Sequence, residues 1–178
     1  LFLTDPARTP DPVRTANRLP PGWGVIYRHF GAPDATGVAH DLARICRAGH
    51  LRLLIAADPL LALKVGADGV HWPFARLAAA RRWRTRFALM TASAHSPADL
   101  RTIAHFPVDA ALLSAVFASA SPTAGKPLGP LKLRALAQRT SCPVYALGGI
   151  GPDNAAMVAP VAGLAAVESV TAAFNPVR

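Results

Sequence analysis

Residues 51–72 read LRLLIAADPLLALKVGADGVHW and contain two apolar runs separated by a helical segment. The apolar run Leu51–Ala56 is followed by a segment with helical spacing, Leu60–Val65, and then by a second apolar run, Gly69–Trp72. Two short apolar runs that flank a helix are typical of parallel strands joined by a crossover helix. Gly66 stands where such a helix should end. The stretch therefore predicts one strand–helix–strand unit.

The same alternation continues in both directions from this unit. Most of the apolar runs are apolar on both faces, as strands covered by helices on both sides must be. The first helix is expected to be short, and the last to be short or missing. The expected strands are Leu1–Thr4, Gly24–Arg28, Leu51–Ala56, Gly69–Trp72, Phe87–Ser93, Ala110–Phe117, Pro143–Leu147 and Gly163–Val167. Helices are expected near Pro12–Arg18, Gly37–Ala48, Leu60–Val65, Ala75–Arg82, Pro97–Ala104, Leu131–Gln138 and Asn154–Val158.

Eight strands with interleaved helices predict a single α/β domain, residues 1–178, folded as a (β/α)8 TIM barrel. An open doubly wound sheet usually has fewer strands. The chain is short for this class, whose usual lower bound is about 200 residues. Short terminal helices would leave one side thinly covered, where a second copy could pack to form a homo-oligomer.

The composition excludes a disordered chain and a membrane-spanning one. The 178 residues are 52% apolar with a mean hydropathy of +0.28, enough to bury a substantial core. No apolar run approaches the ~20 residues that a spanning helix needs. Leu1–Asp5 lacks the basic and long apolar regions of a signal peptide, so a cytoplasmic protein is expected.

The net charge of +9 comes from 16 Arg and 3 Lys against 9 Asp and one Glu. These basic residues are dispersed, with the densest cluster at Arg81–Arg86. No nucleic-acid partner is expected, because net charge alone indicates only solubility and non-specific contacts. Cys46 and Cys142 show neither CxxC nor metal-ligand spacing, which indicates two reduced, buried thiols.

Candidate functional residues are sought at the strand ends, where barrels of this class carry their active sites. Arg28 ends the second strand, and an arginine there needs either a bound anion or the carboxylate of Asp5 as its partner. His71 and Trp72 end the fourth strand, and Trp72 offers a flat surface for an aromatic ligand. Each of these two residues is equally well explained as structural.

Later strand ends carry groups suited to phosphate. The hydroxyl of Ser93 could contact a phosphate, whereas Ser96 is expected to cap the next helix. The loop 119–129 is either a flexible anion clamp or a polar surface loop. Gly148 and Gly149 follow the seventh strand, where barrels commonly bind phosphate through backbone N–H groups.

Six motifs in order resemble the thiamine phosphate synthase/TenI-like family over nearly the whole chain. They are Leu3-Thr4-Asp5, Arg28, Ala67–His71, Ser93–Ser96, Val116-Phe117 with Lys126, and Leu147–Ile150. The resemblance implies a (β/α)8 barrel. Synthases of this family join hydroxymethylpyrimidine diphosphate and thiazole phosphate into thiamine phosphate and release diphosphate with Mg²⁺ assistance. TenI-like members tautomerise a thiazole phosphate.

The resemblance also implies a role for individual residues. Arg28 and Lys126 would be the catalytic contacts to the diphosphate, with Ser93 beside them, and His71 would contact the pyrimidine. Gly148, Gly149 and the backbone around Ser169 would form the thiazole-phosphate cup. Arg76 and Thr123 complete the expected substrate-binding residues.

The sequence departs from the family at the metal and proton-transfer positions. Ala57 and Arg76 replace the two expected metal-binding carboxylates, and Asp58 is the remaining nearby acid. Ala115 replaces the tautomerase histidine. Because Mg²⁺ needs oxygen ligands, usually including carboxylates, no metal and no other cofactor is expected, although the family uses Mg²⁺. The guanidinium of Arg76 could partly replace the ion.

Two functions are compatible with this pattern. The first is a synthase-type transferase that acts on phosphorylated thiamine precursors. The second is a degenerate TenI-like module that binds thiazole or thiamine phosphate without turnover. In both, the partner is a small phosphorylated molecule, and neither a membrane nor a nucleic acid is expected.

Overall fold

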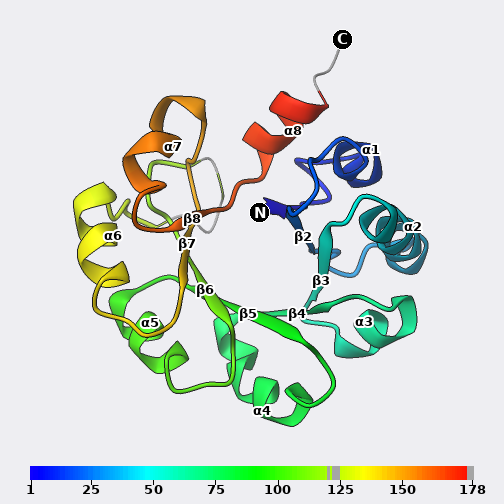
Figure 1. Cartoon of the computed structure of the whole chain (residues 1–178), viewed down its shortest axis with the longest axis horizontal. Coiled ribbons are helices and arrows are strands. Elements are labelled where there is room, and N and C mark those ends of the chain that lie inside the picture. The colour runs from blue at the N-terminus through cyan, green and yellow to red at the C-terminus, as the bar shows by residue number, and fades with distance from the viewer. Residues whose placement is uncertain (120, 122–124, 176–178) are drawn as a thin grey trace. The chain divides into compact units, whose positions relative to one another are not determined.

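Eight parallel strands alternate with helices along the chain (Figure 1). The computed structural model describes residues 1–119, 121 and 125–175, and its strands follow one another in the sheet in chain order, β1 to β8. This order and alternation confirm the (β/α)8 class. Closure of the sheet between β8 and β1 stays a prediction. The strands are β1 (Phe2–Leu3), β2 (Gly24–Tyr27), β3 (Arg52–Ala56), β4 (Gly69–Trp72), β5 (Leu89–Ala94), β6 (Ala110–Leu113), β7 (Val144–Ala146) and β8 (Gly163–Leu164).

Apart from the 14-residue α2, the described helices are short, and the first turns of several carry the expected signals. Five of the described helices have a proline in the first turn, where its missing N–H costs nothing. Ser96 caps α5 as expected, because its hydroxyl accepts from the N–H of Asp99. No described helix has the length and apolar character to cross a bilayer. The helices are α1 (Pro12–Ala16), α2 (Ala35–Ala48), α3 (Pro59–Val65), the 3₁₀ helix η1 (Phe74–Ala79), α4 (Ala80–Trp83), α5 (Pro97–Ile103), α6 (Pro130–Ala137), α7 (Pro152–Val158) and α8 (Glu168–Phe174).

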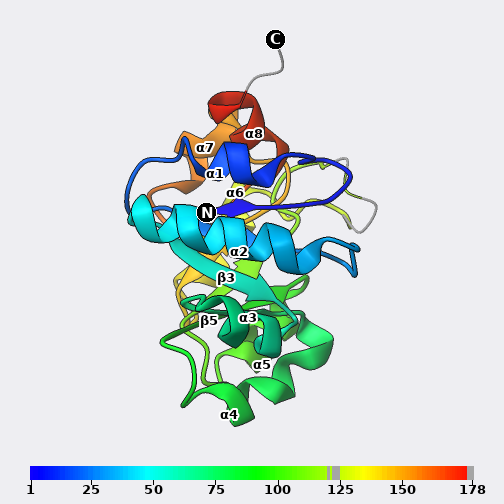
Figure 2. The same cartoon turned by 90° about the vertical axis from the view of Figure 1, so that its right-hand side faces the viewer.

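Residue contacts divide the chain into two compact units. Unit 1 comprises Leu1–His71, Phe87–Leu89 and Val167–Arg178, and unit 2 comprises Trp72–Arg86 and Met90–Ala166. In unit 1, α2 and α3 pack on β3, and α1 packs against both α2 and α8 (Figure 2). In unit 2, α5 packs on β6, and α7 packs on β8 and α6. The expected single domain stays a prediction.

Several strand and helix boundaries differ from the expectation, most clearly at the last helix and at the sixth strand. The last helix is present, because α8 follows β8 and contacts α1. The sixth strand ends at Leu113 rather than Phe117. Beyond it the chain leaves β5 and lies along the segment after β7, where the N–H of Val116 donates to Leu147 and that of Phe117 to Gly148. The apolar run continues past the strand because this segment is also buried.

Trp72 is a core residue and offers no stacking surface to a ligand. Its side chain is fully buried, and its indole N–H donates to Sδ of Met90 at 3.4 Å. The alternation of side chains along β4 explains the difference, since an end position can face the core as readily as the ligand side. The structural alternative for Trp72 is therefore correct.

Candidate active site

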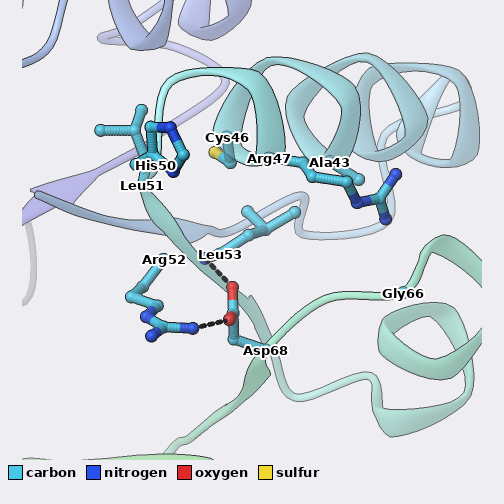
Figure 3. A pocket seen from close by; sticks show the side chains of 9 residues that line it. All are labelled: Ala43, Cys46, Arg47, His50, Leu51, Arg52, Leu53, Gly66 and Asp68. Carbon is cyan, nitrogen blue, oxygen red and sulfur yellow. Dashed lines mark hydrogen bonds and ion pairs between the residues drawn. The ribbon is translucent and has the colours of Figure 1, made fainter. Parts of the chain in front are cut away.

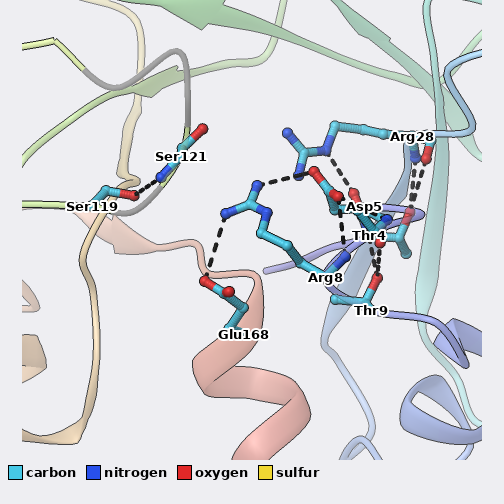
Figure 4. A network of polar contacts seen from close by, with 9 residues as sticks. Thr4, Asp5, Arg8, Thr9, Arg28, Ser119, Ser121 and Glu168 are labelled. Carbon is cyan, nitrogen blue, oxygen red and sulfur yellow. Dashed lines mark hydrogen bonds and ion pairs between the residues drawn. The ribbon is translucent and has the colours of Figure 1, made fainter.

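In unit 1, the carboxyl ends of β1 and β2 bring two arginines onto one carboxylate (Figure 4). Oδ2 of Asp5 lies 3.0 Å from Nη2 of Arg8 and 3.5 Å from Nη2 of Arg28. Arg28 also donates through Nε to the carbonyl of Thr4 at 2.7 Å. Nη1 of Arg8 lies 3.6 Å from Oε2 of Glu168 in α8. The internal ion pair that the sequence offered as the alternative for Arg28 is thus formed.

Burial and charge act in opposite directions on this cluster. Partial burial alone would raise the pKa of the Asp5 carboxyl, but the Arg8 hydrogen bond and charge, the Ala7 N–H and the charge of Arg28 outweigh it. The pKa of Asp5 is therefore below its usual value. Burial lowers the pKa of Arg28, against the opposing effect of Asp5, and Arg8 lowers it further. Asp5 is ionised at neutral pH, and its charge holds both guanidinium groups at the strand ends.

Arg28 keeps part of its guanidinium available while Asp5 holds it in place. Its side chain is 19% exposed, and Cζ lies 5.5 Å from the ring centroid of Phe30. Among the residues that the structure describes, none accepts a hydrogen bond from Nη1 of Arg28. Phe30 is itself 72% exposed, so an apolar surface adjoins this donor. A fixed arginine with an unpaired N–H can receive an anionic oxygen.

Among the described residues, the end of β3 carries one carboxylate close to the position expected for a metal, that of Asp58. Ala57 has no ligand atom in its side chain, and the carboxylate of Asp58 caps α3 by accepting from the N–H of Leu61 at 2.9 Å. The other oxygen of Asp58 lies 3.8 Å from Nε2 of His29. Within the described residues, no group of three or more His, Cys, Asp or Glu side chains could hold a metal. The expectation that no Mg²⁺ site forms here stays a prediction.

His71 lies at the end of β4, two strands away from Arg28. It pairs in register with Ala56, and its carbonyl accepts from the N–H of Ala57 at 2.9 Å. The imidazole is buried, at 4% exposure. Register therefore places His71 on the same edge of the sheet as Arg28, about 10 Å away at ordinary strand spacing.

In unit 2, Gly148 and Gly149 form a turn after β7, and their backbone N–H groups have no acceptor among the described residues. Both have positive φ, 92° and 64°. In the described part of the chain, no acceptor pairs with their N–H groups, whereas the carbonyls of Leu147, Gly148 and Gly149 are all engaged. Unpaired successive N–H groups are suited to an anion.

The same glycines are also required by packing. A Cβ at Gly149 would lie 2.2 Å from the carbonyl oxygen of Ala118, and one at Gly148 would lie 2.9 Å from Cα of Ala115. The loop after β6 thus contacts the turn directly. Glycine at these positions has a structural reason that is independent of any ligand.

The other expected site residues are placed as follows. Ser93 lies in β5 and is half-buried, Arg76 is exposed in η1, and Lys126 is exposed in the segment before α6. Ser169 is half-buried in the first turn of α8. Thr123 lies outside the described residues. The structure unites Arg28 with Asp5 in unit 1, and Gly148 with Gly149 in unit 2.

A pocket of about 260 Å³ opens at the other ends of the strands (Figure 3). Its lining includes Cys46, Arg52 and Asp68, and Asp68 accepts from Arg52 at 2.7 Å and from the N–H of Leu53 at 2.8 Å. Burial and the charge of Asp68 raise the pKa of Cys46 to about 12, so this thiol is protonated and unreactive. The amino-terminal face of such a fold serves stability, and the polar groups here bond to one another.

Sequence reasoning missed two features of the strand ends. Arg8 binds the same carboxylate as Arg28, and its signal was the Asp5-x-x-Arg8 spacing directly after the first strand. Oγ of Ser114, after β6, lies 3.0 Å from Nδ1 of His95, after β5. The matching positions of these two residues just beyond paired strands could have identified that contact.

Comparisons with known proteins agree with this architecture. The sequence model of a family described as thiamine monophosphate synthase matches residues 18–172. Thiamine-phosphate synthase of Herpetosiphon aurantiacus is 31% identical over 175 residues, 94% of this chain and 85% of that protein. The thiamine biosynthesis bifunctional protein ThiM/ThiE of Symbiobacterium thermophilum is 38% identical over 150 residues. That match covers 81% of this chain, and the chain spans 31% of that protein.

A solved structure extends the likeness to the fold. Thiamine phosphate pyrophosphorylase from Pyrococcus furiosus superposes with a TM-score of 0.81 at 22% identity. The superposition covers 98% of this chain and 91% of the other.

Proposed function

Because the chain belongs to the thiamine monophosphate synthase family, we propose that it is a synthase-type transferase that uses arginines where relatives would hold Mg²⁺. Its substrates are a pyrimidine diphosphate and a thiazole phosphate. A ring nitrogen of the thiazole attacks the exocyclic carbon of the pyrimidine, and the carbon–oxygen bond to diphosphate breaks. Diphosphate leaves with the bonding electron pair, and thiamine phosphate is the product.

The observation that carries this proposal is the arginine held at the end of β2. Asp5 and the Thr4 carbonyl fix Arg28 while Nη1 stays unpaired among the described residues. The leaving diphosphate gains negative charge as the bond breaks, and prearranged cationic donors lower the energy of that state. Arg28 would meet this charge. The sequence assigns Lys126 to the same diphosphate and Arg76 to the role of a cation.

The unpaired N–H groups of Gly148 and Gly149 support a separate phosphate contact. The thiazole phosphate would bind there through the backbone. The family resemblance assigns Ser169 to the same phosphate and Ser93 to the diphosphate. Such a contact needs no metal, because N–H donors and a monoester dianion are complementary. His71 would contact the pyrimidine.

A second candidate function follows from the expected absence of a Mg²⁺ site. Asp58 is engaged in capping α3, and Ala57 has no ligand atom. A protein that keeps the phosphate contacts but has lost the metal ligands could bind thiazole or thiamine phosphate without turnover. The two functions differ only in whether the bond between the thiazole nitrogen and the exocyclic carbon of the pyrimidine is formed.

One assay separates the two functions. Both phosphorylated precursors are supplied with 5-fold excess chelator or with added Mg²⁺, and thiamine phosphate is measured after oxidation to its fluorescent derivative. The transferase forms product in both conditions, and Arg28→Met removes product formation. Binding of thiazole phosphate in calorimetry without product would establish the binding module instead. Strict dependence of turnover on Mg²⁺ would refute the role given to the arginines.

A further inference from the structure

Ser114 and His95 occupy matching positions just beyond two paired strands. Ala94 and Leu113, the last residues of β5 and β6, are register partners, and the N–H of Ser114 donates to the carbonyl of Ala94 at 2.9 Å. Ser114 and His95 are therefore the next residues opposite each other, just beyond the carboxyl ends of β5 and β6. Their side chains meet, with Oγ of Ser114 3.0 Å from Nδ1 of His95. Catalytic groups of (β/α)8 enzymes come from such strand ends.

A serine hydroxyl at this distance from an imidazole nitrogen can be activated as a nucleophile. When Nδ1 is unprotonated, it accepts the hydroxyl proton as the oxygen attacks an electrophile. The backbone of His95 is held in place, since its N–H donates to Oδ2 of Asp99 at 2.8 Å. The same carboxylate accepts from the Ser96 hydroxyl, so the start of α5 positions the histidine.

Unpaired backbone donors lie beside this pair. Ala115 follows the serine directly, and within the described ranges of the chain its N–H has no acceptor. Gly148 contacts Ala115, and its N–H is also unpaired among those residues. The N–H of the residue after a nucleophile commonly stabilises the oxyanion of acyl transfer, together with a second N–H from a neighbouring loop.

We propose that Ser114 and His95 form a nucleophile–base pair that hydrolyses small carboxylic esters, an activity that differs from the phosphate chemistry above but would use the same N–H of Gly148. Oγ of Ser114 bonds to the carbonyl carbon while its proton passes to Nδ1 of His95. The ester bond to the alcohol then breaks, and the alcohol leaves with that proton. Water attacks the acyl-serine, gives a proton to His95, and releases the carboxylic acid as Ser114 regains its hydrogen. The net reaction is ester plus water to acid plus alcohol.

A hydrogen bond that only ties two strand ends would not make Ser114 reactive, and this difference gives the test. The intact protein is treated with diisopropyl fluorophosphate, whose phosphorus is attacked by an activated serine with loss of fluoride. Mass spectrometry of the peptides then locates the adduct. We expect labelling at Ser114, and a rate at least about 100-fold lower in His95→Gln, the low end of general-base contributions.

Matched controls use exposed residues of the same kind elsewhere in unit 2. Ser141→Ala and His105→Gln should keep the wild-type labelling rate. Hydrolysis of 4-nitrophenyl acetate should fall in His95→Gln in parallel with labelling, while the near-ultraviolet circular dichroism stays unchanged. Because the adduct is mapped in the wild-type protein, the test does not depend on whether Ser114→Ala folds.

Two outcomes would overturn the proposal. In the first, Ser114 is labelled no faster than Ser141. In the second, His95→Gln is labelled at the wild-type rate, which would leave the histidine without a role as base. Either outcome would reduce the contact to a structural hydrogen bond and would leave the proposed transferase unaffected.

Discussion

Replacing Asp5 by asparagine should destabilise the protein and strengthen its binding of diphosphate at the same time. Asparagine keeps an oxygen that can accept from the N–H groups of Ala7 and Arg8 but removes the charge shared by two guanidinium groups. Two arginines that lose this partner repel each other, which lowers stability. Because the Asp5 carboxylate no longer competes for the same two arginines, they should bind diphosphate more tightly.

The magnitude follows from the burial of the ion pairs. Exposed pairs contribute about 0–1 kcal/mol, and removing one partner of a fully buried pair costs about 3–5 kcal/mol. The side chains of Asp5 and Arg28 are 16% and 19% exposed, so the loss should be about 2 kcal/mol. For a chain of this size, that corresponds to a fall in Tm of about 4–8 °C. If this whole free energy of about 2 kcal/mol instead favours the binding of diphosphate to the two arginines, diphosphate binds up to about 30-fold more tightly.

The pH dependence has a definite sign. The pKa of Asp5 is lowered in the folded protein, so its stabilising contribution is complete above the unfolded pKa of about 3.9. That contribution is lost as the pH falls through the lower, folded value. The free energy of unfolding measured in urea should therefore be lower for Asp5→Asn than for wild type at pH 7. This difference in free energy should become smaller below pH 4. Equal stability at pH 7, or weaker diphosphate binding in calorimetry, would refute the reasoning.

Three further predictions concern single positions. Arg76→Asp should introduce a dependence of diphosphate affinity on Mg²⁺, measured by calorimetry with and without the ion, and an unchanged affinity would show that position 76 lies away from the anion. Asp58→Ala should cost about 1 kcal/mol in urea unfolding, because α3 loses its cap, whereas Asp58→Asn should cost only a few tenths. Gly149→Ala should destabilise the protein even without ligand, because its Cβ would overlap the carbonyl of Ala118. Equal urea midpoints for Gly149→Ala and wild type would contradict this packing.

Local signals in the sequence predicted the elements well. Ser96 caps α5 and Gly66 ends α3 with φ 68°, because such capping depends on a few neighbouring residues. Alternation of apolar runs and helices was sufficient for the fold class. The end of β6 was predicted four residues too late, because Ala115 and Val116 are still buried after the chain has left the strand, and burial alone does not show where a strand ends.

The site was less predictable, because it depends on which side chains meet. The pairing of Arg28 with Asp5 was anticipated as one of two alternatives, since both lie at ends of neighbouring strands. Sharing of that carboxylate by Arg8 depends on the turn after β1, and the contact of Ser114 with His95 depends on strand register. Trp72 was interpreted as a possible ligand surface because of its residue type, whereas in the structure its side chain fills part of the core.

The contact between α1 and α8 sets an order on folding during synthesis. Arg18 donates to the carbonyl of Phe174 at 3.1 Å, and the ring of Phe174 packs edge-on against Trp23 with centroids 5.3 Å apart. A ribosome that has reached residue 90 has produced most of unit 1 but not the helix that completes its packing. This long-range closure must wait for about 80 further residues, several seconds at ~5–20 residues per second. Throughout that interval α1 lacks the helix that packs against it in the folded protein.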